Sequence, residues 1–63
     1  MNAAAVELAV LEALKRERRY VGTARVAYAA GLPVAEVRAA LLALEKRGQV
    51  IRSRNHHWLA RSW

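Results

Sequence analysis

The sequence predicts a mainly α-helical fold with a small β-hairpin. Two short helical patterns flank the tight turn Gly31-Leu32-Pro33. Gly48 ends the second of these helices and begins a run with strand character. A chain of 63 residues is long enough for one small domain. We therefore expect a single domain over residues 1–63, with three helices and a small β-sheet of two or three strands that includes the hairpin.

The first helix is expected from Ala3 to Arg18, because apolar residues repeat at helical spacing along one face. This inward set is Val6, Val10, Ala13 and Leu14. Glutamates lie toward the start of the helix and basic residues toward its end, an order that favours the helix dipole. Leu11 lies at the edge of the inward face, whereas Leu8 lies well off it, near Ala4.

The second helix is expected from Ala24 to Ala30, with Thr23 as its N-cap. Gly31 ends it in the left-handed conformation that glycine tolerates best. Pro33 is predicted as the first residue of the third helix, where its missing N–H costs nothing. The inward residues of these two helices are Val26, Ala27 and Ala30, then Val37, Ala40, Leu41 and Leu44.

Two strands are predicted at Val50–Arg52 and His57–Leu59, joined by residues 53–56. Tyr20 and Val21 form a further short extended piece. Because side chains alternate along a strand, Trp58 and Leu59 cannot both face the core.

The charge of the chain indicates the class of partner. Lys and Arg number 11 against 5 acidic residues, for a formal charge of +6 and an isoelectric point near 11.2. A basic balance favours nucleic acid by steering and counterion release. A helix, a tight turn, a second helix and a hairpin present one helix to a groove. We therefore predict a small transcriptional regulator that binds double-stranded DNA, with its third helix in the major groove and its basic hairpin on the backbone.

The base-reading residues follow from the inward face of the third helix, since the opposite face would meet the groove. The predicted base contacts are Val34, Ala35, Arg38, Ala39 and Leu42. Arg38 is the long donor among them and suits a guanine edge, whereas the small apolar residues could touch thymine methyl groups with little selectivity. Leu42 equally fits an ordinary exposed leucine or a contact with another protein.

The predicted contacts to the DNA backbone come from the second helix, the end of the third helix and the hairpin. They are Thr23, Arg25, Tyr28, Lys46, Arg52, Arg54, Asn55, His56 and Trp58. A solvated surface is the alternative for Tyr28 and for the hairpin charges. A small DNA binder often doubles its contacts, so a homodimer through Ala4, Leu8 and Leu11 is also predicted.

These residues resemble the winged helix-turn-helix family. The resemblance covers the chain from Val10 to about Ala60 and is carried by Thr23-Ala24-Arg25-Val26-Ala27, Ala30-Gly31-Leu32, Val37, Leu41 and Leu44-Glu45-Lys46-Arg47-Gly48-Gln49-Val50. It implies the winged fold and nucleic-acid binding, although such domains also bind RNA and proteins.

The resemblance leaves two narrower readings. Pro33, Glu36, Leu41, Gly48 and Trp58 are similar to winged helices that bind Z-form nucleic acid, but Arg38 and Leu42 replace the asparagine and tyrosine of that group. The runs 48–52 and 57–59 are similar to the RNA-binding winged helices of the selenocysteine-specific elongation factor and to the winged helix that ends a DNA-uptake protein. An RNA-binding module cut from a larger protein, or a protein-interaction module, therefore stays an alternative.

Other function classes find no support in the sequence. His56 and His57 would point to opposite faces of a strand and lack a third ligand at useful spacing, so no metal site is predicted. Neither serine has an obvious base and orienting acid, and no glycine-rich phosphate loop occurs, so we expect neither an enzyme nor a cofactor. No apolar stretch reaches the length of a membrane span and no signal peptide is evident, so we expect a cytoplasmic protein without a membrane or small-molecule partner.

Overall fold

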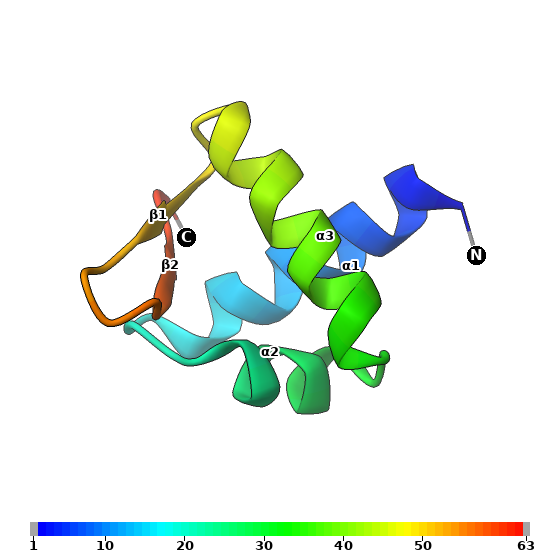
Figure 1. The fold of residues 1–63 in the computed structure, drawn as a ribbon, viewed down its shortest axis with the longest axis horizontal. Coiled ribbons are helices and arrows are strands. Elements are labelled where there is room, and N and C mark those ends of the chain that lie inside the picture. The colour runs from blue at the N-terminus through cyan, green and yellow to red at the C-terminus, as the bar shows by residue number, and fades with distance from the viewer. Residues whose placement is uncertain (1, 63) are drawn as a thin grey trace.

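The computed structural model describes residues 2–62, which form three helices followed by a two-stranded hairpin (Figure 1). The elements are α1 (Ala3–Glu17), α2 (Thr23–Ala30), α3 (Val34–Lys46), β1 (Val50–Arg52) and β2 (Trp58–Ala60). In Figure 1, α1 lies behind α3, α2 lies below them, and the hairpin flanks the helices on the left. The predicted fold class is therefore confirmed.

The ends of α1 follow from local chemistry. Asn2 is the N-cap, and its side-chain Oδ1 accepts a hydrogen bond of 2.8 Å from the Ala5 backbone N–H. Arg18 is the C-cap in the left-handed conformation, with φ 54°, so the helix ends at Glu17, one residue earlier than predicted. The four predicted inward residues of this helix are all buried.

The turn between α2 and α3 has the predicted glycine device. Gly31 adopts φ 69°, and the Leu32 N–H donates to the Ala27 carbonyl at 3.1 Å, which closes the end of α2. Two boundary details differ from the prediction by one residue. Gly22, not Thr23, is the N-cap of α2, and Pro33 is the N-cap of α3, not its first residue. The chain turns by 107° between the two helices, within the usual range of helix-turn-helix motifs.

Gly48 ends α3 as predicted. Its φ of 74° lets the Gln49 N–H donate to the Leu44 carbonyl at 2.9 Å, so the chain reverses directly into β1. The inward residues of α3, which are Val37, Ala40, Leu41 and Leu44, are all buried.

The hairpin is antiparallel, with Val50 opposite Ala60, Ile51 opposite Leu59 and Arg52 opposite Trp58. The second strand begins at Trp58, one residue later than predicted. The reason is that His57 closes the turn, where its N–H donates to Ser53 Oγ at 3.0 Å and its carbonyl accepts from the Ser53 N–H at 2.8 Å. Val21 also pairs with Trp58 through an isolated antiparallel bridge, so the predicted extended piece lies beside β2 as a third, one-residue segment of the wing.

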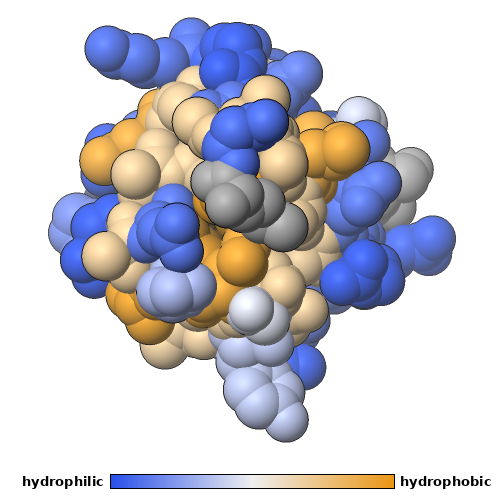
Figure 2. All heavy atoms as spheres, turned by 90° about the vertical axis from the view of Figure 1, so that its right-hand side faces the viewer, coloured by the Kyte–Doolittle hydropathy of each residue, from blue (hydrophilic) through white to orange (hydrophobic). Residues whose placement is uncertain are grey.

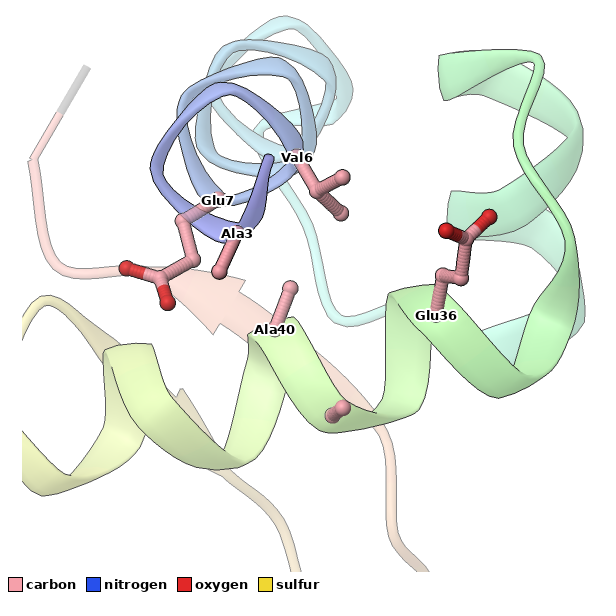
Figure 3. A pocket seen from close by; sticks show the side chains of 6 residues that line it. Ala3, Val6, Glu7, Glu36 and Ala40 are labelled. Carbon is pink, nitrogen blue, oxygen red and sulfur yellow. The ribbon is translucent and has the colours of Figure 1, made fainter. Parts of the chain in front are cut away.

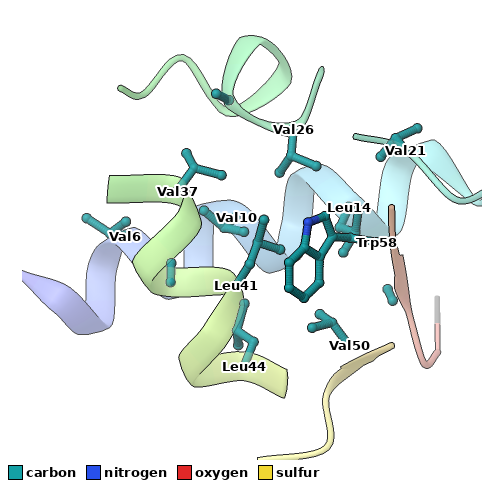
Figure 4. Packing of buried hydrophobic residues seen from close by; sticks show 13 residues of the cluster. Val6, Val10, Leu14, Val21, Val26, Val37, Leu41, Leu44, Val50 and Trp58 are labelled. Atoms are coloured by element: carbon teal, nitrogen blue, oxygen red, sulfur yellow. The ribbon is translucent and has the colours of Figure 1, made fainter. Parts of the chain in front are cut away.

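The core lies where the three helices meet the wing (Figure 4). Trp58 is only 3% exposed and packs beside Leu14, Leu41 and Val50, whereas Leu59 is half-buried. The choice between Trp58 and Leu59 is thereby decided in favour of the larger apolar surface, whose burial contributes more free energy.

Candidate nucleic-acid interface

The outward face of α3 is open to solvent along its length. Val34 is 41% exposed and Leu42 is 44% exposed, and the smaller and charged residues between and beyond them are exposed as well. These others are Ala35, Arg38, Ala39 and Lys46. All five predicted base-contact residues are therefore exposed.

Arg38 differs from Arg25 and Arg52, which are each paired with a glutamate. Within residues 2–62 it takes part in no ion pair, side-chain hydrogen bond or cation–π contact. Its guanidinium group is therefore available to a ligand without first leaving a carboxylate, as a base-reading arginine needs.

The start of α2 has free backbone N–H donors beside the Thr23 hydroxyl, which is hydrogen-bonded to Trp58. No side chain caps its first turn, so the leading N–H groups remain open to an anion. Thr23, predicted as the cap, has another role: its Oγ1 accepts a hydrogen bond of 3.0 Å from Trp58 Nε1. The hydroxyl proton of Thr23 is then left for an external acceptor such as a phosphate.

Arg25 and Tyr28 stand together on the exposed side of α2. The Arg25 guanidinium lies 5.8 Å from the centre of the Tyr28 ring and 3.5 Å from a Glu17 carboxylate oxygen. The same carboxylate group lies 3.6 Å from Arg19, which places a second arginine beside Arg25. Arg19 was not among the residues predicted to contact the backbone, although it belongs to the basic run before Gly22.

Trp58 was predicted to contact the DNA backbone, and that prediction is wrong. The side chain is buried and its one polar atom is already paired with Thr23, so it has no surface to offer a phosphate. It supports the wing instead, because the Arg52 guanidinium lies 5.4 Å from its ring centre. Arg52 is further held by Glu45 at 3.2 Å, an ion pair that joins the wing to the end of α3.

The tip of the wing carries Arg54, Asn55 and His56, all exposed. The His56 N–H donates to the Ser53 carbonyl at 3.1 Å, and His56 itself has φ 62°. This is a three-residue hairpin connection that ends in a left-handed residue. His56 lies in the connection as predicted, whereas His57 lies before the second strand and not on it. Among the described residues no group of three or more His, Cys, Asp or Glu side chains could hold a metal ion.

The predicted dimer residues do not form one uniform patch. Ala4 is exposed and Leu8 is 57% exposed, whereas Leu11 packs against the core. Together they line a shallow surface hollow of about 280 Å³ that extends toward Leu44 and Arg47. An ion pair between Arg47 and Glu7 closes one side and fastens α1 to the end of α3.

A second hollow, of about 270 Å³, lies between the first turns of α1 and α3 (Figure 3). Its lining is apolar except for Glu7 and Glu36, and Glu7 already pairs with Arg47. Figure 2 shows this side of the molecule, where hydrophobic residues make up much of the centre and hydrophilic residues are most numerous at the rim. The residues that line this hollow include no Ser, Thr, Cys, His or Lys side chain beside the two carboxylates.

One further observation bears on membranes. Between residues 2 and 62 no single helix is long and apolar enough to cross a bilayer. The bent α2–α3 pair, taken together, has sufficient length and apolar composition, but the two helices meet at an angle of 107°.

The arrangement is thus an accessible helix face flanked by a helix start and a basic wing. A comparison with curated proteins finds no match. Residues 3–53 match the family model of the IclR helix-turn-helix domain, a stretch that runs from the start of α1 through β1. The chain belongs to the IclR helix-turn-helix family, whose winged domains are the DNA-binding, non-catalytic parts of transcriptional regulators.

Proposed function

We propose that this domain binds double-stranded DNA with α3 in the major groove and the wing along the sugar–phosphate backbone. The observation that carries the proposal is the outward face of α3, where an unpaired Arg38 stands between exposed small residues. Base contacts are proposed for the five exposed residues of that face. The family supplies DNA as the ligand, and the geometry supports the orientation.

Backbone contacts are proposed around this helix, at both of its flanks. On one side are the open first turn of α2 with Thr23, Arg25, Tyr28 and the added Arg19. On the other are Lys46, Arg52 and the wing tip with Arg54, Asn55 and His56. Arg25 and Arg52 are each paired with a glutamate. Each ion pair restricts the arginine side chain before binding and so lowers the conformational entropy lost on binding. The arginine must exchange its carboxylate partner for a phosphate when DNA binds.

A salt titration tests the proposal. Duplex affinity should fall linearly with the logarithm of salt concentration, with a slope of about −0.9 for each phosphate neutralised. An NMR titration with the same duplex should shift amides in α3, at the start of α2 and at the wing tip. Affinity that does not respond to salt, or shifts confined to the first two turns of α1, would remove the proposed orientation.

A homodimer is the proposed assembly, through the surface around Ala4 and Leu8. Leu8 supports it, because a leucine exposed by more than half borders an apolar hollow. Sedimentation of the wild type and of Leu8→Glu distinguishes the states. A lower mass for the variant supports the dimer, and equal masses count against it.

Protein interaction through α3 is the second candidate, favoured by the exposure of Leu42 between Ala35 and Ala39 on one side and Lys46 on the other. It predicts that Leu42→Glu abolishes a complex or a self-association. A competition experiment between matched RNA and DNA hairpins distinguishes recognition of an RNA stem from recognition of DNA.

We also propose a cytoplasmic location, supported by the absence of cysteine, and a single folded unit over residues 1–63.

A further inference from the structure

The reading face of α3 is unusual in its chemistry. Of the five residues proposed to meet bases, only Arg38 carries a hydrogen-bonding group; the others are Val34, Ala35, Ala39 and Leu42. No Asn, Gln, Ser or Thr lies on α3 at all. Lys46, at the end of the same helix, is proposed to contact the backbone. A base edge beneath Val34, Ala35, Ala39 or Leu42 therefore faces aliphatic carbon.

The major groove offers one group that suits aliphatic carbon. Every base edge there carries a donor or an acceptor, and thymine adds a C5-methyl group. A donor or acceptor that loses its water against a leucine or valine without a new partner is penalised, whereas a methyl group gains from the same contact. The surface thus selects against polar edges and favours thymine.

The spacing of the side chains limits how many base pairs are read. Ala35 and Leu42 are separated by seven residues, so their Cα atoms lie roughly 10 Å apart along the helix, about three base pairs of DNA. Arg38 lies between them in this span and suits the two acceptors of a guanine edge.

We propose that α3 recognises a short step in which one guanine, bound by Arg38, is flanked by thymines whose methyl groups pack on Ala35, Ala39 and Leu42. This proposal rests on the proposed placement of α3 in the major groove. DNA is favoured over a protein as the occupant because of the net charge of +6 and because the centre of the face holds an arginine that no described carboxylate neutralises.

The experiment exchanges thymine for deoxyuridine, which removes the methyl group and keeps base pairing. Duplexes with a randomised central window are selected for binding, and the preferred duplex is resynthesised with each thymine replaced in turn. A buried CH₂-sized group contributes about 0.8 kcal/mol, so each contacted thymine should lose about fourfold in affinity. Thymines outside the three-base-pair step are the matched control and should lose nothing.

A protein variant locates the contact. Leu42→Ala keeps a strong helix former at an exposed position, so the fold should be retained. It should weaken binding to the thymine duplex by several fold and abolish the deoxyuridine effect at one position only. Arg38→Ala should leave every deoxyuridine effect unchanged while it removes the preference for guanine.

The outcomes separate this inference from the proposed function. If deoxyuridine has no effect at any position while Arg38→Ala still weakens binding, methyl recognition is overturned and the placement of α3 stands. If no duplex is bound in a salt-dependent manner, the placement itself fails. If Leu42→Ala leaves DNA affinity unchanged and instead dissociates a protein complex, the leucine belongs to a protein interface and the inference is overturned.

Discussion

The hydrogen bond between Trp58 and Thr23 should be one of the more valuable polar contacts in this molecule. It joins residues 35 positions apart, and it ties the wing to the start of α2. A chain of 63 residues has an unfolding free energy of about 3–9 kcal/mol, at roughly 0.05–0.15 kcal/mol per residue. A contact worth about 1 kcal/mol is therefore a large fraction of the total.

Two conservative substitutions and their combination measure this contact. Thr23→Val keeps the shape but leaves the indole N–H of Trp58 without a partner, at a cost of about 1–3 kcal/mol. Trp58→Phe removes the N–H and leaves a small void, for about 2–3 kcal/mol. In the double variant no unpaired N–H remains, so its cost should be about 1 kcal/mol or more below the sum of the two.

Urea unfolding followed by circular dichroism gives all four free energies under one set of conditions. Equal m-values across the variants would show that two-state comparison is valid. Costs that add within about 0.3–0.5 kcal/mol would refute the reasoning, because they would mean that the two side chains act independently.

Four further outcomes are expected. Arg38→Ala should cost about 1–3 kcal/mol in duplex binding and relax specificity at one base pair, measured by fluorescence anisotropy on single-base variants of the site. Arg54→Ala should weaken binding to every sequence alike and lower the salt slope by about 1, whereas Lys15→Ala on α1 should leave the slope unchanged. Arg18→Gly should raise the unfolding free energy by about 1 kcal/mol, since φ 54° suits glycine better than arginine, and a lower value would contradict the capping argument. Leu41→Ala at a fully buried site should cost about 2–5 kcal/mol in urea unfolding, and a cost near zero would mean that α3 does not pack as described.

The exposed leucines Leu8 and Leu42 are proposed to have different roles, in self-association and in DNA recognition. Leu8 on α1 and Leu42 on α3 are both exposed, so mass and duplex affinity should be measured for a substitution at each position.

Several features of the molecule were fixed by the amino-acid sequence alone. The three helices and the glycine turns at Gly31 and Gly48 depend on interactions within about one helical turn, and they were predictable. The predicted inward residues are buried except Ala30 on α2, which is half-buried. The outward position of Arg38 followed in the same way, because the period of the helix is constant.

Tertiary structure decided what each wing and α2 residue contacts. Alternation required a choice between Trp58 and Leu59 but did not make it; packing against Leu14, Leu41 and Val50 did. The same holds for Thr23, which became a partner of Trp58 instead of a cap, and for the ion pair of Arg52 with Glu45. These contacts join residues far apart in sequence, so they depend on strand register and helix docking, which local periodicity does not encode.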